Sequence, residues 1–151
     1  HALRRAEGFR LRLLEEDTNG NLVEHPLQDL EGRSVLAVDL QGELFFAASE
    51  ELELRLRELM DHGHRFIVLR LQQAYNMDLT CAQALTHVAK EARRRGGMLI
   101  LSGVRPGTFK MMERGGIIDL LGAENVFVAE STLLGSTHKA IDLAQQLASE
   151  A

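Results

Sequence analysis

Asp78 and Thr80 are the strongest candidates for functional residues in this chain, because they lie between a strand-like run and a helix-like run. Upstream, Phe66–Leu71 is short and rich in branched apolar residues, which is typical of a strand buried on both faces. Downstream, apolar residues recur every three or four positions and share one face of a helix. The spacing predicts Thr80 as the N-cap, with Gln83 completing a capping box. A carboxylate and a hydroxyl thus stand at a helix start, where free amides and the dipole favour negative charge.

Spacing alone favours the simpler interpretation of the Asp78–Thr80 junction, which is a capped helix after a turn. Other candidate functional sites in the sequence have less support. His62 and His64 lie close together, but no Cys or carboxylate stands at a recognisable metal-ligand spacing, so we expect no metal site. Ser102 and Cys81 have no His partner that the sequence identifies. There is no Gly-rich phosphate loop. We therefore expect no catalytic residues, no cofactor and no enzyme.

Composition limits the classes of function. The formal net charge of -5 argues against nucleic-acid binding, which needs clustered positive charge. The basic run Arg93–Arg95 is best interpreted as cations that complement the negative end of a helix dipole. Contact with anionic lipid headgroups or an acidic partner is the alternative. The single cysteine, Cys81, excludes an internal disulfide and suits a reducing compartment. No apolar run approaches the roughly 20 residues that span a bilayer, so we expect a soluble fragment.

Strand-like and helix-like segments alternate along the chain, which indicates the α/β class with adjacent parallel strands. We expect residues 1–151 to form a single domain with about four to five α-helices. An initial strand-to-strand step makes the sheet mixed, though mostly parallel. Residues 9–40 hold the first two strands, with a polar insertion at about 17–33, and 41–151 form the alternating core. The expected strands are 9–16, 35–40, 66–71, 98–101 and 126–128. The expected helices begin near Ser49, which can cap the first of them, near Thr80 and Pro106, and between Ser131 and Thr137.

Two segments carry a family resemblance. Asp78-Leu79-Thr80 followed by Leu85 resembles the Asp-x-Ser/Thr signature of STAS domains, the module shared by sulfate permeases and anti-sigma-factor antagonists. The run from Gly42 to Ala48, which includes Phe45 and Phe46, is similar to the corresponding segment in the C-terminal domains of SulP anion permeases. Antagonists usually carry a polar residue there. One departure is Cys81, because the family often has Gly at that position.

The resemblance implies a non-catalytic, cytoplasmic regulatory and interaction domain of a SulP-type sulfate-like anion transporter, on the inner side of the cell membrane. Its site residues would be Asp78, Leu79, Thr80 and Cys81, which we expect to be exposed at the carboxyl end of a central strand. Its partners would be the transmembrane domain of the parent transporter, a cytosolic regulatory protein, or a weakly bound nucleotide or anion. The alternative is a free-standing antagonist-like signalling protein, switched when a kinase phosphorylates Thr80. Because the chain begins with His1, we expect a tag remnant or a piece of a longer protein.

Overall fold

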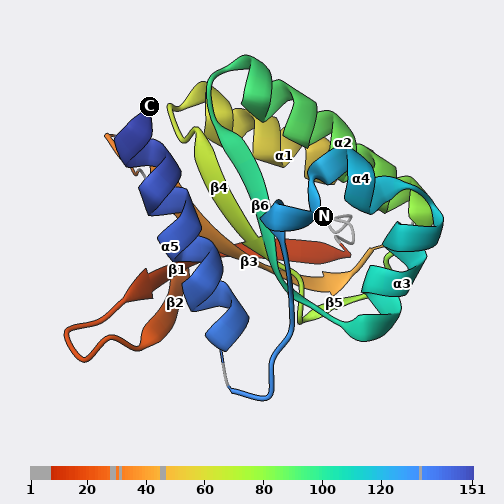
Figure 1. Ribbon diagram of the computed structural model, residues 1–151, viewed down its shortest axis with the longest axis horizontal. Coiled ribbons are helices and arrows are strands. Elements are labelled where there is room, and N and C mark those ends of the chain that lie inside the picture. The colour runs from red at the N-terminus through yellow and green to blue at the C-terminus, as the bar shows by residue number, and fades with distance from the viewer. Residues whose placement is uncertain (1–7, 28–29, 31, 45–46, 133) are drawn as a thin grey trace, which may run out of the picture.

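The computed structural model describes residues 8–27, 30, 32–44, 47–132 and 134–151 (Figure 1). These residues form seven strands and five α-helices. The strands are β1 (Phe9–Glu16), β2 (Leu22–Pro26), β3 (Val35–Glu43), β4 (Phe66–Arg70), β5 (Ala74–Tyr75), β6 (Met98–Val104) and β7 (Val126–Val128). The helices are α1 (Ala48–Asp61), α2 (Leu79–Arg94), α3 (Pro106–Arg114), α4 (Ile117–Leu121) and α5 (Gly135–Glu150), with a 3-10 turn at Ala123–Asn125.

The strands make one mixed sheet in the order β2-β1-β3-β4-β6-β7, and β5 extends it by pairing with β3. Strand β1 is antiparallel to both β2 and β3, whereas β3, β4, β6 and β7 run parallel to one another. Parallel neighbours need crossover connections, and α1 and α2 supply two of them on the same face. Figure 1 shows α5 alone on the opposite face. The expected α/β fold with a mixed, mostly parallel sheet is confirmed.

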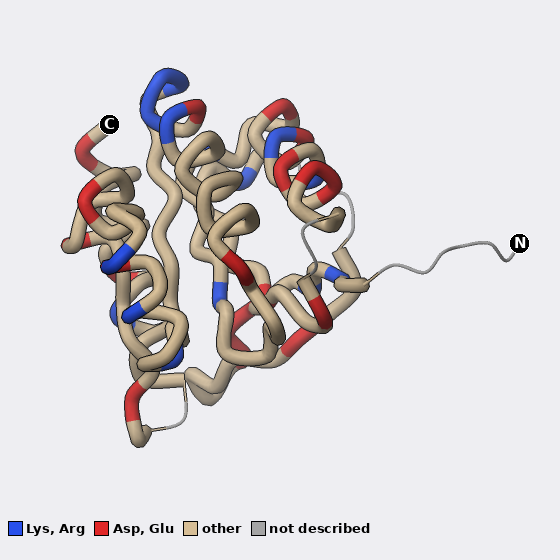
Figure 2. The backbone as a smooth tube through the Cα atoms, turned by 90° about the vertical axis from the view of Figure 1, so that its right-hand side faces the viewer, with Lys and Arg blue, Asp and Glu red and all other residues tan. Residues whose placement is uncertain are grey.

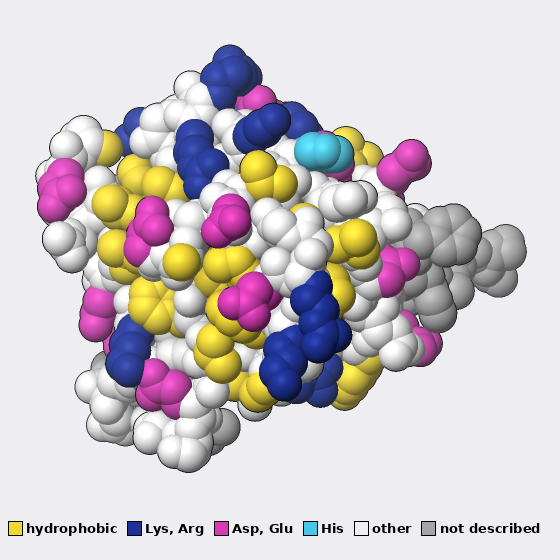
Figure 3. All heavy atoms as spheres, turned by 45° about the vertical axis from the view of Figure 1, so that its right-hand side comes forward, with side chains coloured by type: hydrophobic (Ala, Val, Ile, Leu, Met, Phe, Trp, Pro, Cys, Tyr) yellow, Lys and Arg dark blue, Asp and Glu magenta, His cyan; other side chains and the backbone are white. Residues whose placement is uncertain are grey.

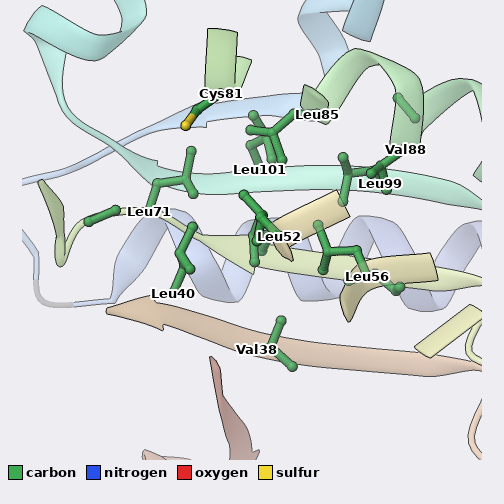
Figure 4. Packing of buried hydrophobic residues seen from close by; sticks show 14 of the residues in the cluster. Val38, Leu40, Leu52, Leu56, Leu71, Cys81, Leu85, Val88, Leu99 and Leu101 are labelled. Carbon is green, nitrogen blue, oxygen red and sulfur yellow. The ribbon is translucent and has the colours of Figure 1, made fainter. Parts of the chain in front are cut away.

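The main hydrophobic core lies between the sheet and the pair α1 and α2. Leucines at successive turns of α1 meet alternate residues of β3 and β6, because side chains on a strand point to opposite faces in turn (Figure 4). A smaller cluster lies under α5. The main cluster includes Val38, Leu40, Leu52, Leu56, Leu85, Val88, Leu99 and Leu101, and the smaller one includes Ala37, Val68, Ile100, Ala140 and Ala144.

Three local expectations need correction. Helix α1 has Ala47 at its N-cap, so Ser49 is its second helical residue and is buried. Strand β3 does not stop at Leu40 but continues through Gly42, where pairing with both β1 and β5 extends it. Residues 17–33 are not only a polar insertion, because they contain the edge strand β2.

Candidate functional site at the start of helix α2

The candidate site lies at the carboxyl edge of the sheet, where parallel α/β sheets commonly bind their ligands. The chain leaves β4 at Arg70, pairs briefly with β3 as β5, and enters α2 at Leu79. Asn76 adopts a left-handed backbone conformation with φ of 58°, and its side-chain amide donates a 2.7 Å hydrogen bond to Glu43. This turn therefore holds the entry to α2 against the end of β3.

Asp78, and not Thr80, is the N-cap of α2. Asp78 has an extended backbone, and its carboxylate accepts a 3.0 Å hydrogen bond from the amide of Cys81. Thr80 is the second helical residue, so the expected capping box with Gln83 does not form. Both Asp and Thr are good N-cap residues, and Asp78 takes the position because its carboxylate reaches the third helical amide.

Three of the four expected site residues are on the surface. Asp78 and Thr80 are exposed, and the side chain of Leu79 is 40% exposed. Cys81 has no exposed area, which corrects the expectation that it is displayed with the others. Cys81 is buried because it lies one helical turn before the buried Leu85, on the face of α2 that packs against the sheet.

The thiol of Cys81 is a core group. Its Sγ lies 3.8 Å from the carbonyl oxygen of Leu44, and Figure 4 shows it directed toward the sheet. Burial, together with the nearby carboxylate of Asp78, raises the pKa of the Cys81 thiol to about 11. Because the thiolate is the reactive form, Cys81 is a poor nucleophile at neutral pH.

Leu79 connects the start of α2 to the end of α3. Its side chain packs over Gly115 at the end of α3, so closely that a Cβ on Gly115 would lie 2.5 Å from the Leu79 Cδ1 atom. Leu79 therefore lies against the end of α3 while part of its surface stays exposed. An exposed apolar side chain beside an exposed carboxylate and hydroxyl is suited to contact with another molecule.

A pocket next to this junction contains Arg105, a residue that the sequence analysis did not select. The pocket has a volume of about 360 Å³ and lies between the loop after β5 and the start of α3. The Arg105 guanidinium donates a hydrogen bond to the carbonyl of Ala74 and lies 5.6 Å from the ring centroid of Tyr75. Figure 3 shows Lys and Arg side chains gathered low on the face that carries α3, beside exposed hydrophobic ones. The only signal in the sequence is an Arg placed directly before the Pro that opens a helix.

The other candidate residues have partners within the fold. Arg93 donates to the carbonyls of Leu120 and Leu121 at the end of α4, at 3.0 and 2.6 Å. Arg94 and Arg95 both pair with Glu91, and their hydrogen bonds lower the pKa of that carboxyl to about 2. Figure 2 shows this basic run at the top of the molecule, at the end of α2. These contacts support the structural interpretation of the run.

The histidines considered for a metal bind the backbone. Nδ1 of His62 lies 2.7 Å from the carbonyl oxygen of Glu58, and Nδ1 of His64 lies 2.6 Å from that of Arg33. Within the described ranges, no group of three His, Cys, Asp or Glu residues is arranged to hold a metal ion. Phe45 and Phe46, which carry part of the family resemblance, lie outside the described residues.

Comparison with known proteins places this geometry in a family. The family model described as "STAS domain" matches residues 28–132. The STAS domain of a SulP transporter from Vibrio cholerae is 24% identical, with a TM-score of 0.60, over 81% of this chain and 89% of that one. The phosphorylated cell fate determinant SpoIIAA from Bacillus is 19% identical, with a TM-score of 0.54, over 76% of this chain and 94% of that one.

A third similar structure belongs to a much larger protein. The murine Solute Carrier 26 family member A9 anion transporter is 16% identical, with a TM-score of 0.67, over 89% of this chain but only 22% of that one. These likenesses show the fold. In the part of this chain that the structure describes, no helix is both long and apolar enough to cross a membrane.

Proposed function

Because this chain belongs to the STAS domain family, we propose that it is a non-catalytic regulatory and interaction domain that acts through the start of α2. The observation that carries the proposal is the exposed trio of Asp78, Leu79 and Thr80 on a helix start that Asp78 itself caps. The cap holds the backbone at the helix start, and Leu79 lies against Gly115. A partner would therefore meet a carboxylate, an apolar side chain and a hydroxyl side by side.

The parent protein that this proposal favours is a SulP-type secondary transporter of a sulfate-like anion. Three observations support it: the likeness to the Vibrio SulP domain over 81% of this chain, the similar segment from Gly42 to Ala48, and the likeness to a small part of a mammalian anion transporter. The domain would lie on the cytoplasmic side of the membrane, where the start of α2 contacts the transmembrane domain or a cytosolic regulatory protein. A nucleotide or anion bound weakly in the Arg105 pocket would be a second way to regulate the transporter at this surface.

A matched pair of substitutions in the full-length transporter tests this proposal. Leu79→Glu puts a charge into the proposed contact, and Leu120→Glu does the same at an apolar side chain of α4 that is 53% exposed. We expect Leu79→Glu to lower the initial rate of sulfate uptake about fivefold or more, the effect of losing a contact worth about 1 kcal/mol. Leu120→Glu should leave uptake unchanged. Equal uptake by both variants, at equal amounts in the membrane, would count against the proposed surface.

The alternative is an antagonist-like signalling protein, and the exposed hydroxyl of Thr80 favours it. The likeness to the phosphorylated Bacillus protein is compatible with the same interpretation. A phosphate on Thr80 would meet the free amides of the first turn of α2 and the carboxylate of Asp78, so attraction and repulsion would compete. Intact-mass and peptide mass spectrometry of the protein from its native cells distinguishes the two. Stoichiometric phosphate on Thr80 would select the antagonist, and its absence would favour the transporter.

A further inference from the structure

A second cleft lies on the other side of Tyr75, away from the start of α3. It has a volume of about 470 Å³, and its walls include Arg10, Gln41, Gly42, Gln73 and Tyr75. Arg10 is the only charged side chain among the described residues that line it. Tyr75 is 51% exposed and presents an aromatic surface to the cleft. Phe9 also lines the cleft, so polar and aromatic groups share its walls, with one cation and no carboxylate among the described residues.

The guanidinium of Arg10 is held by a buried amide. Its Nε donates a 3.0 Å hydrogen bond to Oε1 of Gln41, which faces it across the pairing of β1 with β3. Gln41 is 8% exposed, and its Nε2 donates to Asp39 at 2.8 Å and to Glu24 at 2.9 Å. Because the amide nitrogen must face these two carboxylates, the amide oxygen is left to face Arg10. Neither terminal nitrogen of Arg10 has a hydrogen-bond partner among the described residues.

The network of hydrogen bonds and ion pairs around Arg10 carries an excess of positive charge. Asp39 pairs with Arg70 at 3.0 Å, and Glu24 pairs with Arg12 at 3.1 Å. Adding Arg10 gives three guanidinium groups against two carboxylates, an excess of one positive charge. The excess lies on Arg10, because each of the other two arginines already has a carboxylate partner. An anion at Arg10 would complete the network.

We propose that this cleft binds a small oxyanion, either a carboxylate or a sulfate-type group, through the two terminal nitrogens of Arg10. A guanidinium whose Nε is already engaged still offers two parallel N–H groups, which match the spacing of two oxygens on such an anion. Gln73 and Tyr75 form the opposite wall. The site is separate from the exposed trio of α2 and does not depend on the function proposed for it. Because Gln73 and Tyr75 directly precede the turn into α2, an anion in the cleft would contact the segment that positions that trio.

Titration of the whole 151-residue chain with anions, followed by two-dimensional NMR, tests the proposal. Sodium sulfate and sodium acetate are the two probes, each added at constant ionic strength. We expect saturable shifts of the Arg10 Nε–H signal and of the backbone amides of Gly42, Gln73 and Tyr75. Saturation by sulfate alone, by acetate alone or by both supports the site and identifies which oxyanion it prefers. Linear shifts with both probes would overturn it.

Three variants show whether the anion pairs with Arg10 or responds to overall charge. Arg10→Gln removes the two parallel N–H groups, Arg10→Lys keeps the charge without them, and Arg114→Gln removes one charge from the end of α3, outside the cleft and the network around Arg10. We expect the Kd to rise about tenfold in Arg10→Gln, which is the loss of one charge-assisted contact, and by less in Arg10→Lys. Arg114→Gln should bind as the unmodified chain does. A similar loss in Arg114→Gln, or unchanged binding in a folded Arg10→Gln variant, would refute the assignment.

Discussion

Removal of the Asp78 side chain gives the sharpest test of how the start of α2 is built. The Asp78 carboxylate accepts the amide of Cys81, while the exposed side chain of Thr80 makes no capping contact. Replacing an N-cap residue with Ala costs about 1 kcal/mol, and loss of a negative charge beside the helix dipole falls within the same range. For a domain of this size, each kcal/mol corresponds to about 2–4 °C in Tm. Asp78→Ala should therefore lower Tm by about 2–4 °C.

The matched control is Thr80→Ala, which places a good helix former at an exposed helical position. We expect it to change stability by no more than about 0.5 kcal/mol. Asp78→Ser should recover most of the stability lost in Asp78→Ala, because a hydroxyl can also cap. Thermal melts followed by circular dichroism, with urea unfolding as a second measure, give the comparison. If Thr80→Ala melted as low as Asp78→Ala, or if Asp78→Ser recovered nothing, the assignment of the cap to Asp78 would be wrong.

Further outcomes follow from two buried groups and from one glycine contact. Asp39→Ala should lower the free energy of unfolding by about 3–5 kcal/mol, because it leaves Arg70 charged and unpaired in the interior. The double variant Asp39→Ala with Arg70→Met should lose less stability than Asp39→Ala alone, as measured by urea unfolding. Cys81 should resist alkylation by iodoacetamide at pH 8 until urea unfolds the chain. Because the pKa of Cys81 is raised from 9.0 to about 11 on folding, its contribution to stability should be complete below pH 9 and fall as the pH rises toward 11 in urea melts. Gly115→Ala should displace the Leu79 side chain, seen as shifted Leu79 methyl signals by NMR, whereas the same change at the open Gly107 should not.

The sequence predicted the parts of the fold whose pattern is long or strongly apolar. Strand β4 is buried at every residue, and α2 carries a regular apolar stripe, so both were predictable from local pattern. Strand β2 was not, because its five residues are mostly exposed and include Pro26, and it is a strand only through pairing with β1. Helix α4 is five residues long between glycines. Its residues Ile117, Ile118 and Leu121 are buried and Arg93 binds its last carbonyls, and these tertiary contacts were not visible in the sequence.

The candidate site was predictable in position but not in its atomic roles. The end of a buried strand followed by a helix start located Asp78 and Thr80 correctly at the edge of the sheet. Two good caps two residues apart, however, left the helix boundary ambiguous. The burial of Cys81 does not depend on that boundary, because Cys81 lies one turn before Leu85 on the buried face of α2, a relation that the spacing already contained. Arg105 and the Arg10 cleft were missed because they depend on strands far apart in the chain.

The assignment of the cap to Asp78 changes what Thr80 can do in either branch of the family. A capping hydroxyl could not be modified without weakening α2, so a phosphate there would act by disturbing the helix. With Asp78 as the cap, the hydroxyl of Thr80 is exposed and not required by the fold. A phosphate or a Glu at this position would instead change the charge displayed next to Leu79 while the helix persists, because negative charge in the first turn is compatible with the dipole. Regulation at this site would therefore change contact with a partner and leave the domain folded.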